Sequence, residues 1–399
     1  MNSLTKISIE EFLLYFTIAI SILWDPIRHF LIPTEGAGRT VIVCSLVTLC
    51  NRKYFSTTIN ILKYPSLIIW TILVLYSLIN SLYKGFWGAN ENMTLWGLLR
   101  ALYFRPFIFL TLLIVGLREN RVKCLYVILI ASFLYLCWGS LNLHSWTVDS
   151  GRQMSSLGNS LPLFTVTSFF IAGVMYLNGL LKRELFLFIC LLCVFVIFSS
   201  GTRKAFGAGV IILIGVVLDK SGKFSFLKIL RLCLISYVLY FGISFVIENS
   251  LIGARIIHSE KYNVQLVENE WLNKFLMLFL GDRSNMYLQG IEVFRDSPIT
   301  GIGHMNFLYY YSSATHVLHT EYIAQLAENG LIGLVLLMWY YFVLFCEIVR
   351  KQKQIGIFRT IYLFALISIL FINFTAWTYC ASYVMIIYAC LLDFVYSEG

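Results

Sequence analysis

Residues 124–143 read CLYVILIASFLYLCWGSLNL, an apolar run that contains no charged side chain. A membrane-spanning helix needs about 20 mainly apolar residues, because each residue adds about 1.5 Å and the hydrocarbon core is about 30 Å thick. Similar runs recur along the whole chain. Of its 399 residues, 59% are hydrophobic and only 13% are charged, unlike the average soluble domain. The sequence therefore predicts an all-α, polytopic membrane protein.

The apolar runs predict about twelve transmembrane helices. The first run has no small-residue cleavage site and ends at Asp25 and Pro26, so we interpret it as a retained span and not as a signal peptide. A loop at 248–321 separates the spans of residues 1–247 from those of residues 322–399, and we expect one integral domain. The predicted spans are 8–24, 36–50, 62–83, 93–116, 124–143, 157–180, 184–200, 204–219, 229–246, 322–348, 357–374 and 377–396.

Basic residues gather in alternate connections between these spans. By the positive-inside rule those connections face the cytoplasm, and both chain ends then lie there as well. The turn at 199–203 and the loop at 248–321 face outward, so we expect any chemistry on that side. Residues 284–294 show helical periodicity, which predicts short helices within the loop. The basic residues of the cytoplasmic connections are Arg52, Lys53, Lys63, Arg118, Arg121, Lys123, Lys182, Arg183, Lys220, Lys223, Lys228, Arg231, Arg350, Lys351, Lys353 and Arg359.

Composition and motifs exclude several classes of function. Although the net charge is +9, the basic residues form short clusters between apolar runs, so we expect no nucleic-acid binding. The ten cysteines lie within or at the ends of apolar runs, which indicates packing and not a disulfide framework. The sequence contains no D-x-D or H-E-x-x-H metal motif, no Walker loop and no G-x-S-x-G elbow. We therefore expect neither a metal site nor a cofactor.

Residues 199–204 read SSGTRK and form a predicted tight turn between two spans at the outer surface. Arg203 and Lys204 place positive charge almost within the membrane. One interpretation is an interfacial anchor whose side chain reaches the lipid phosphates. The other is a guanidinium held at a lipid diphosphate, for which arginine has the matching bidentate geometry.

Arg283 begins a predicted helix in the long loop. It shares an apolar face with Tyr287, Gly290 and Phe294 at helical spacing. A charge on a face that packs inward is costly unless it meets an anion. A solvated surface position therefore explains Arg295 better than it explains Arg283, and Arg283 is a candidate anion-binding residue.

Two histidines precede the tenth predicted span, in HVLHTEY at 316–322. His319 shares a helical face with Tyr322. Histidine suits proton acceptance near neutral pH, although a histidine at a membrane entrance is often only an interfacial polar residue. His316 and His319 alone would form an incomplete metal site. His319 is thus a candidate general base.

Two further charges, Arg100 and Arg105, lie within the fourth predicted span. Charges inside a membrane are costly and need a partner. Contact with a lipid headgroup and pairing between helices both explain them.

Three stretches, in this order, resemble the O-antigen ligase and polymerase family of bacterial envelopes. They are SSGTRKAFGAG at 199–209, GDRSNMYLQGIEVFRDSPITGIGHMNF at 281–307 and HTEYIAQLAENGLIGL at 319–334. The last two are similar to the family's signature: an arginine-led helix, a proline-then-glycine turn, and a histidine that opens a helix broken at a glycine. One departure is Thr320, where the family more often has asparagine. The resemblance implies a fold like that of the GT-C membrane glycosyltransferases.

The resemblance also implies an activity. Members of the family take a glycan from undecaprenyl diphosphate on the periplasmic side of the bacterial inner membrane. By position, Arg203 and Arg283 match the diphosphate-binding arginines, and Lys204 and Arg295 are further candidates for the same role. His319 matches the essential histidine, which implies a general base in a reaction that needs no metal.

The leading expectation is an O-antigen ligase, which transfers O-antigen polysaccharide to the lipid A-core. Membrane lipids would surround the protein as further partners. The alternative is the repeat-unit polymerase, which uses the same carrier. Some polymerases have a glycine eleven positions after an arginine, but here Ile214 follows Arg203 and Phe294 follows Arg283 at that spacing. A transporter would explain the many spans, yet it predicts repeated half-sequences that the chain lacks. The sequence leaves the oligomeric state open.

Overall fold

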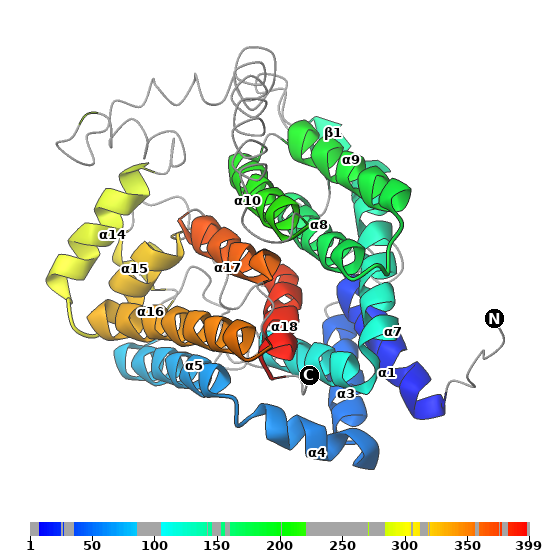
Figure 1. Ribbon diagram of the computed structural model, residues 1–399. Coiled ribbons are helices and arrows are strands. Elements are labelled where there is room, and N and C mark those ends of the chain that lie inside the picture. Colours follow the sequence, from blue (N-terminus) through cyan, green and yellow to red (C-terminus); the bar gives the residue numbers. More distant parts are fainter. Residues whose placement is uncertain are drawn as a thin grey trace.

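The computed structural model describes residues 8–24, 27, 36–85, 105–141, 143–145, 153–155, 160–200, 202–220, 270, 284–304, 306–311, 318, 320–355, 359–374, 376 and 382–396. Most of these residues are helical, as the sequence predicts (Figure 1). The helices are α1 (Ile9–Ile22), α3 (Gly36–Leu49), α4 (Arg52–Ile61), α5 (Pro65–Lys84), α7 (Arg105–Leu141), α8 (Ser160–Leu177), α9 (Arg183–Ser200), α10 (Arg203–Lys220), α14 (Ser284–Asp296), α15 (Phe307–Tyr310), α16 (Glu321–Ile355), α17 (Thr360–Asn373) and α18 (Ser382–Tyr396).

A short antiparallel hairpin accompanies the helices. Its strands are β1 (Leu143–Ser145) and β2 (Gln153–Ser155), and Leu143 lies opposite Ser155. The expectation of an all-α fold did not include this hairpin. Three residues a strand are too few for the alternating pattern that marks a strand in a sequence.

The described helices are those of a membrane protein. Within the described residues, three helices are long and apolar enough to cross a bilayer, and they are Pro65–Lys84, Pro106–Leu141 and Glu321–Gln354. Shorter apolar helices cover Leu161–Leu177, Thr360–Asn373 and Val384–Tyr396. The ninth predicted span, 229–246, and Arg100 lie outside the described residues, and so does the side chain of Arg105.

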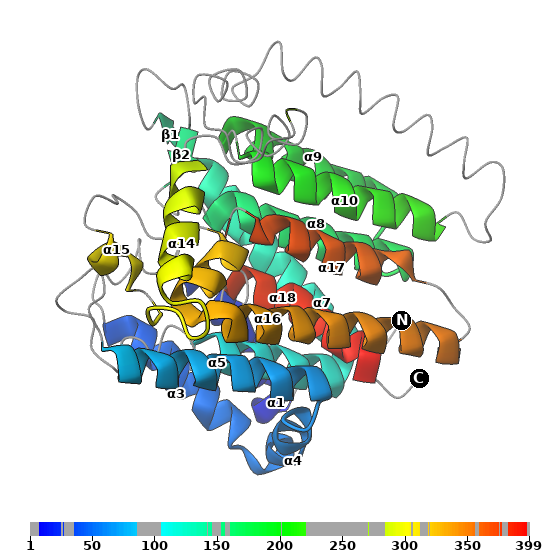
Figure 2. The same ribbon diagram turned by 90° about the vertical axis from the view of Figure 1, so that its left-hand side faces the viewer.

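The bundle has one main direction, along which α5, α10, α16 and α17 run (Figure 2). α14 and α15 lie at one end of it, and they are two of the short helices expected in the long loop. α18 lies in the core, where all residues from 384 to 394 are buried. α10 and α17 approach closely, because a Cβ added to Gly215 would lie only 2.7 Å from Cβ of Phe364.

α7 changes direction at Asn120, where the backbone leaves helical geometry with φ −157° and ψ 97° (Figure 1). Charged residues directly after this point bind other helices. Arg121 Nε lies 3.3 Å from Asp393 Oδ2 of α18, and Lys123 Nζ lies 2.8 Å from Glu11 Oε1 of α1. These ion pairs hold three helices together.

The same region marks the end of the bundle opposite α14. Arg121 donates a hydrogen bond of 2.9 Å to the hydroxyl of Tyr362 at the start of α17, whereas α14 contacts the carbonyl of Phe374 after the end of α17. Lys53 of α4 pairs here with Glu119. We call this the basic end of the bundle, because residues of the predicted cytoplasmic connections gather there.

Candidate functional site

α16 is broken at Gly330, whose φ of 65° and ψ of −163° lie in a region that is accessible essentially only to glycine. The break separates a short helix, which begins at Glu321, from a long apolar helix. A break in a membrane helix frees backbone amides and carbonyls, and each such group is costly unless another part of the protein binds it. The groups that bind them form a buried polar cluster.

The segment Pro298–Gly303 lies across the break and bonds to both of its sides. Its carbonyls accept hydrogen bonds of 2.8 and 3.4 Å from the amides of Leu331 and Ile332. Its amides donate bonds of 3.0 and 2.8 Å to the carbonyls of Ala327 and Glu328. The segment thus replaces the backbone bonds that the helix loses.

Two glycines allow this close approach. Gly301 has a φ of 67°, and a Cβ there would lie 2.4 Å from the carbonyl carbon of Glu328. A Cβ on Gly330 would lie 2.3 Å from the carbonyl oxygen of Ile299. Any larger residue at either position would push the two backbones apart. This contact explains the proline-then-glycine turn and the glycine break of the sequence.

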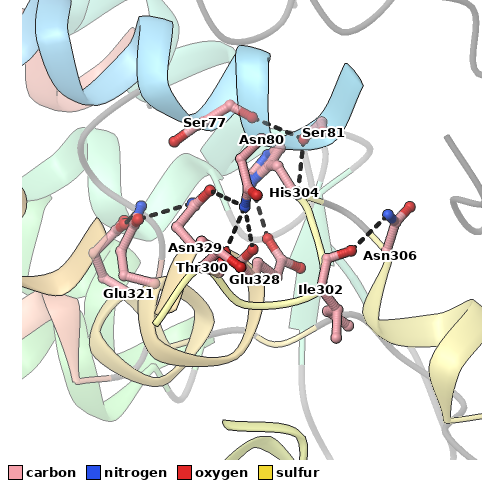
Figure 3. Close-up of polar contacts among 11 residues, drawn as sticks. Ser77, Asn80, Ser81, Thr300, Ile302, His304, Asn306, Glu321, Glu328 and Asn329 are labelled. Atoms are coloured by element: carbon pink, nitrogen blue, oxygen red, sulfur yellow. Dashed lines mark hydrogen bonds and ion pairs between the residues drawn. The ribbon is translucent and has the colours of Figure 1, made fainter. Parts of the chain in front are cut away.

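Polar side chains of α5 donate further hydrogen bonds to carbonyls at the break (Figure 3). Asn80 Nδ2 donates to the carbonyls of Thr300 at 2.6 Å and of Glu328 at 3.0 Å. Tyr76 donates its hydroxyl to the carbonyl of Asn329 at 3.1 Å. Asn80 is buried in a mostly apolar helix, and these carbonyls provide the hydrogen-bond acceptors that its buried amide requires.

His304 and Glu328 form a buried pair beside Asn80 (Figure 3). His304 Nδ1 lies 2.8 Å from Glu328 Oε2, and the two side chains are 3% and 1% exposed. The backbone amide of His304 donates to Ser81 Oγ at 2.8 Å. The pair connects His304 to α16, and the hydrogen bond connects it to α5.

A ladder of buried polar side chains runs along the short helix from its first residue to the break. Gln325 Nε2 donates to Glu321 Oε1 at 3.1 Å, and Asn329 Nδ2 donates to Gln325 Oε1 at 2.9 Å. The spacing of four residues places all three on one face of the helix. The ladder begins at Glu321, which follows His319, the expected general base, by two residues. It therefore extends from the start of α16 to the buried polar cluster at the break.

α14 packs against the short helix through a glycine. A Cβ on Gly290 would lie 2.3 Å from Ile323 Cγ2 and 3.3 Å from Leu318 Cδ2. This contact confirms that the face of α14 that carries Gly290 points inward. A small apolar core surrounds it, made of Val293, Ile302, Phe307, Leu318, Ala324 and Ala327.

Three helices of the family-like stretches meet at the C-terminal end of α17. On α10, Gly207 lies so close to Phe371 that an added Cβ would be 2.5 Å from its ring. On α14, Tyr287 donates its hydroxyl to the carbonyl of Phe374. On α16, Tyr322 packs edge-on against the ring of Phe374, with ring centroids 5.0 Å apart.

The three residues expected to carry the chemistry precede these contacts by three or four positions in the sequence. Arg203 is the first residue of α10, and its side chain lies outside the described residues. Arg283 and His319 also lie outside them, directly before Ser284 and Thr320. The structure therefore brings together the described neighbours of all three residues, while their roles stay predictions.

The two additional candidates lie in different surroundings. Lys204 is half-buried near the start of α10. Arg295 is exposed and lies in the last turn of α14, about 17 Å along the helix from Ser284. Their proposed contact with a diphosphate stays a prediction, and the position of Arg295 is the less favourable of the two.

Asn80, His304 and Glu328 were not singled out by the sequence analysis. A signal for two of them was present, because Asn80 and Glu328 are polar residues inside predicted spans, where polar side chains usually bind one another. No sequence spacing connects them, since Asn80 and Glu328 are 248 residues apart.

The comparison with known families finds a match over the part of the chain that contains the family-like stretches. Residues 188–338 match a family model described as O-antigen ligase, and no curated protein matches the chain. The matched part begins in α9, ends within α16, and includes all three family-like stretches, the segment Pro298–Gly303 and the break at Gly330. This part of the chain is similar to the O-antigen ligase family.

Proposed function

We propose that this protein is an O-antigen ligase, a glycosyltransferase that moves O-antigen polysaccharide from undecaprenyl diphosphate to the lipid A-core. The observation that carries the proposal is the meeting of α10, α14 and α16 at the end of α17. Gly207, Tyr287 and Tyr322 make these contacts, and each follows an expected site residue by three or four positions in the sequence. In this proposal the active site lies beside Phe374.

The reaction would join the donor glycan to a hydroxyl of the core sugar. That hydroxyl oxygen attacks the anomeric carbon, the bond from this carbon to the diphosphate oxygen breaks, and its electron pair leaves with undecaprenyl diphosphate. A ring nitrogen of His319 accepts the hydroxyl proton, a role that contributes about 10²- to 10⁴-fold in rate. Arg203 and Arg283 bind the diphosphate and stabilise its developing charge, so the scheme assigns no role to a metal.

The polar ladder and the broken helix support this assignment of roles. Glu321 is fully buried at the start of α16, and its partners Gln325 and Asn329 reach the break that Pro298–Gly303 fills. These bonds hold the first turn of α16 in a fixed orientation. A rigid helix start suits a general base, because small misplacements of a catalytic group cause large losses in rate.

The proposal includes an orientation and a fold. α14 and α15 would face the periplasm, and the basic end would face the cytoplasm together with both chain ends, in the inner membrane of a Gram-negative cell. The ion pairs of Arg121 and Lys123 at one end, and the family-like helix starts at the other, support this orientation. We further propose a fold like that of the GT-C enzymes, with about twelve spans.

The experiment that tests the proposal is the replacement of His319 by Ala, with the cell's lipopolysaccharide examined by gel. We expect bare lipid A-core and accumulation of long carrier-linked glycan, because transfer stops after the polymer is complete. His316→Ala is the matched control, and we expect it to leave the normal ladder.

Other outcomes would lead to different conclusions. Core that carries a single repeat unit would assign the chain as the polymerase, which uses the same carrier. An unchanged ladder in His319→Ala, with the protein present at its normal level in the membrane, would remove His319 from the mechanism.

A further inference from the structure

α4 differs from the other helices of the basic end in both direction and composition. It covers only Arg52–Ile61, and in Figure 2 it is seen nearly end-on below α5, whereas α5 and α16 run across the view. Asn51 caps its start by accepting a 2.9 Å bond from the amide of Lys53. α4 therefore lies across the direction of the spans and does not continue α3 or α5.

The side of α4 that faces the protein is well packed. Tyr54 and Ile61 are 2% and 0% exposed, and they lie on the same face because seven residues make about two turns. Lys53 pairs with Glu119 of α7 and lies 5.2 Å from the ring centre of Tyr54. These contacts hold α4 against the bundle, so its orientation is fixed.

An apolar stripe lies on a second side. Phe55, Ile59 and Leu62 are 50%, 41% and 45% exposed. At about 100° a residue, they fall within one sector of about 60°, next to the packed face. A continuous apolar stripe of this kind on a helix across the spans is typical of helices that lie in a membrane surface.

A basic side borders the stripe. Arg52 and Lys63 are exposed, and continuing the helical spacing through Leu62, whose backbone is still αR, places Lys63 within about 20° of Arg52, next to the sector of Ile59. Lys63 Nζ donates a 3.2 Å bond to Asn60 Oδ1, a neutral amide that leaves the lysine charge uncompensated. Neither residue makes an ion pair with a described residue. The order around the helix is thus protein face, apolar stripe and basic side.

We infer that α4 lies in the headgroup layer at the basic end and binds anionic phospholipids. The apolar stripe would enter the upper acyl region, and Arg52 and Lys63 would contact lipid phosphates at the level above it. Basic side chains near an anionic membrane surface attract it, and two charges at one level of a helix provide a preferred position for an anionic lipid. This lipid site is remote from the candidate active site at the C-terminal end of α17, and it does not depend on the proposed reaction.

The test uses the purified full-length protein in mild detergent with phosphatidylglycerol and phosphatidylcholine as probes, and it measures bound lipid by native mass spectrometry. We expect the unchanged protein to bind phosphatidylglycerol in preference to phosphatidylcholine. The variant Arg52→Gln with Lys63→Gln should reduce this preference by about fivefold for each charge removed. The control is Arg350→Gln with Lys353→Gln, two exposed basic residues in the last turns of α16. We expect it to keep the preference.

A second variant tests the apolar stripe. Phe55→Ser with Ile59→Ser should lower the retention of both lipids equally, because it removes insertion and keeps the charges. The inference is wrong if the α4 charge variant keeps its full preference, or if the α16 control loses as much. It is also wrong if the protein is a dimer that Phe55→Ser with Ile59→Ser dissociates, since a second copy would then cover the stripe.

Discussion

α7 and α16 are both interrupted, at Asn120 and at Gly330, and the two interruptions are built in opposite ways. At Asn120 the chain changes direction at the basic end, and charged side chains bind neighbouring helices from partly exposed positions. At Gly330 the helix breaks in the buried interior, and backbone groups of Pro298–Gly303 replace its lost hydrogen bonds. The first is a turn, whereas the second is a joint between two parts of the protein.

This difference predicts which of the two interruptions tolerates substitution. The charged side chains of α7 at this turn are partly exposed and can exchange a protein partner for water at small cost, whereas Asp393, which binds Arg121, is buried and depends on its partner. The joint at Gly330 needs a glycine, a crossing segment and a side chain from α5 at the same time, because buried backbone groups have no water to replace them. We expect the largest effects of substitution at the joint.

The substitution Gly330→Ala should have the largest effect. The backbone geometry of Gly330 costs other residues about 1–3 kcal/mol, and the contact of the new Cβ with Ile299 adds a similar amount. We expect a loss of about 4 kcal/mol in the free energy of unfolding, measured by thermal unfolding in detergent, and little folded protein. Gly179→Ala is the control, because Gly179 has a φ of 70° but nothing lies within 4 Å of its added Cβ.

Gly179→Ala should cost only about 1–2 kcal/mol, the backbone component alone. Equal losses in the two variants would mean that the contact with Pro298–Gly303 contributes nothing. The joint would then be no more demanding than a surface turn.

Replacing Glu328 by Leu should have an intermediate effect. His304 would remain buried without its carboxylate partner, and a buried polar group left in this way costs about 1–3 kcal/mol. The double variant with His304→Phe should be less destabilised than the sum of the single variants, by about 1 kcal/mol or more. Additive losses in thermal unfolding would show that the two residues act independently.

Replacing Lys53 by Met should have the smallest effect. The hydrogen bond to Glu119 raises the pKa of the Lys53 amine, so the pair is present at neutral pH and is lost as the pH rises through that raised pKa. The lysine is 41% exposed, and pairs of this kind contribute about 0.5 kcal/mol or less. The small difference in unfolding should disappear in 1 M salt, whereas the loss in Gly330→Ala should not. Lys353→Met provides the surface control.

The class of fold followed from the sequence because apolar runs and basic clusters are local signals. The interruption at Asn120 lies within the predicted connection between the fourth and fifth spans, where Arg118, Arg121 and Lys123 gather. Likewise, the glycine break in α16 was expected from the family signature, and Gly330 confirms it. The hairpin of β1 and β2 and the helix α4 were not predicted, since both are too short for a clear period.

The candidate site was only partly predictable. The family-like stretches gave Arg203, Arg283 and His319, and residues beside each of them meet near Phe374. The pairing of the buried polar residues could not be foreseen, because Asn80 reaches the carbonyl of Glu328 only through the fold. Pairings between residues more than two hundred positions apart leave no periodic trace in a single sequence.

The bonds of Asn80 have a consequence for how the chain is made. Asn80 binds the carbonyl of Glu328, which is synthesised 248 residues later. At about 5–20 residues per second, a ribosome needs roughly 12 to 50 s to cover that distance. Until Thr300 is made, 220 residues after Asn80, α5 is present in the bilayer with an amide that has none of its final partners, so a temporary neighbour, whether insertion machinery or an earlier helix, must shelter it.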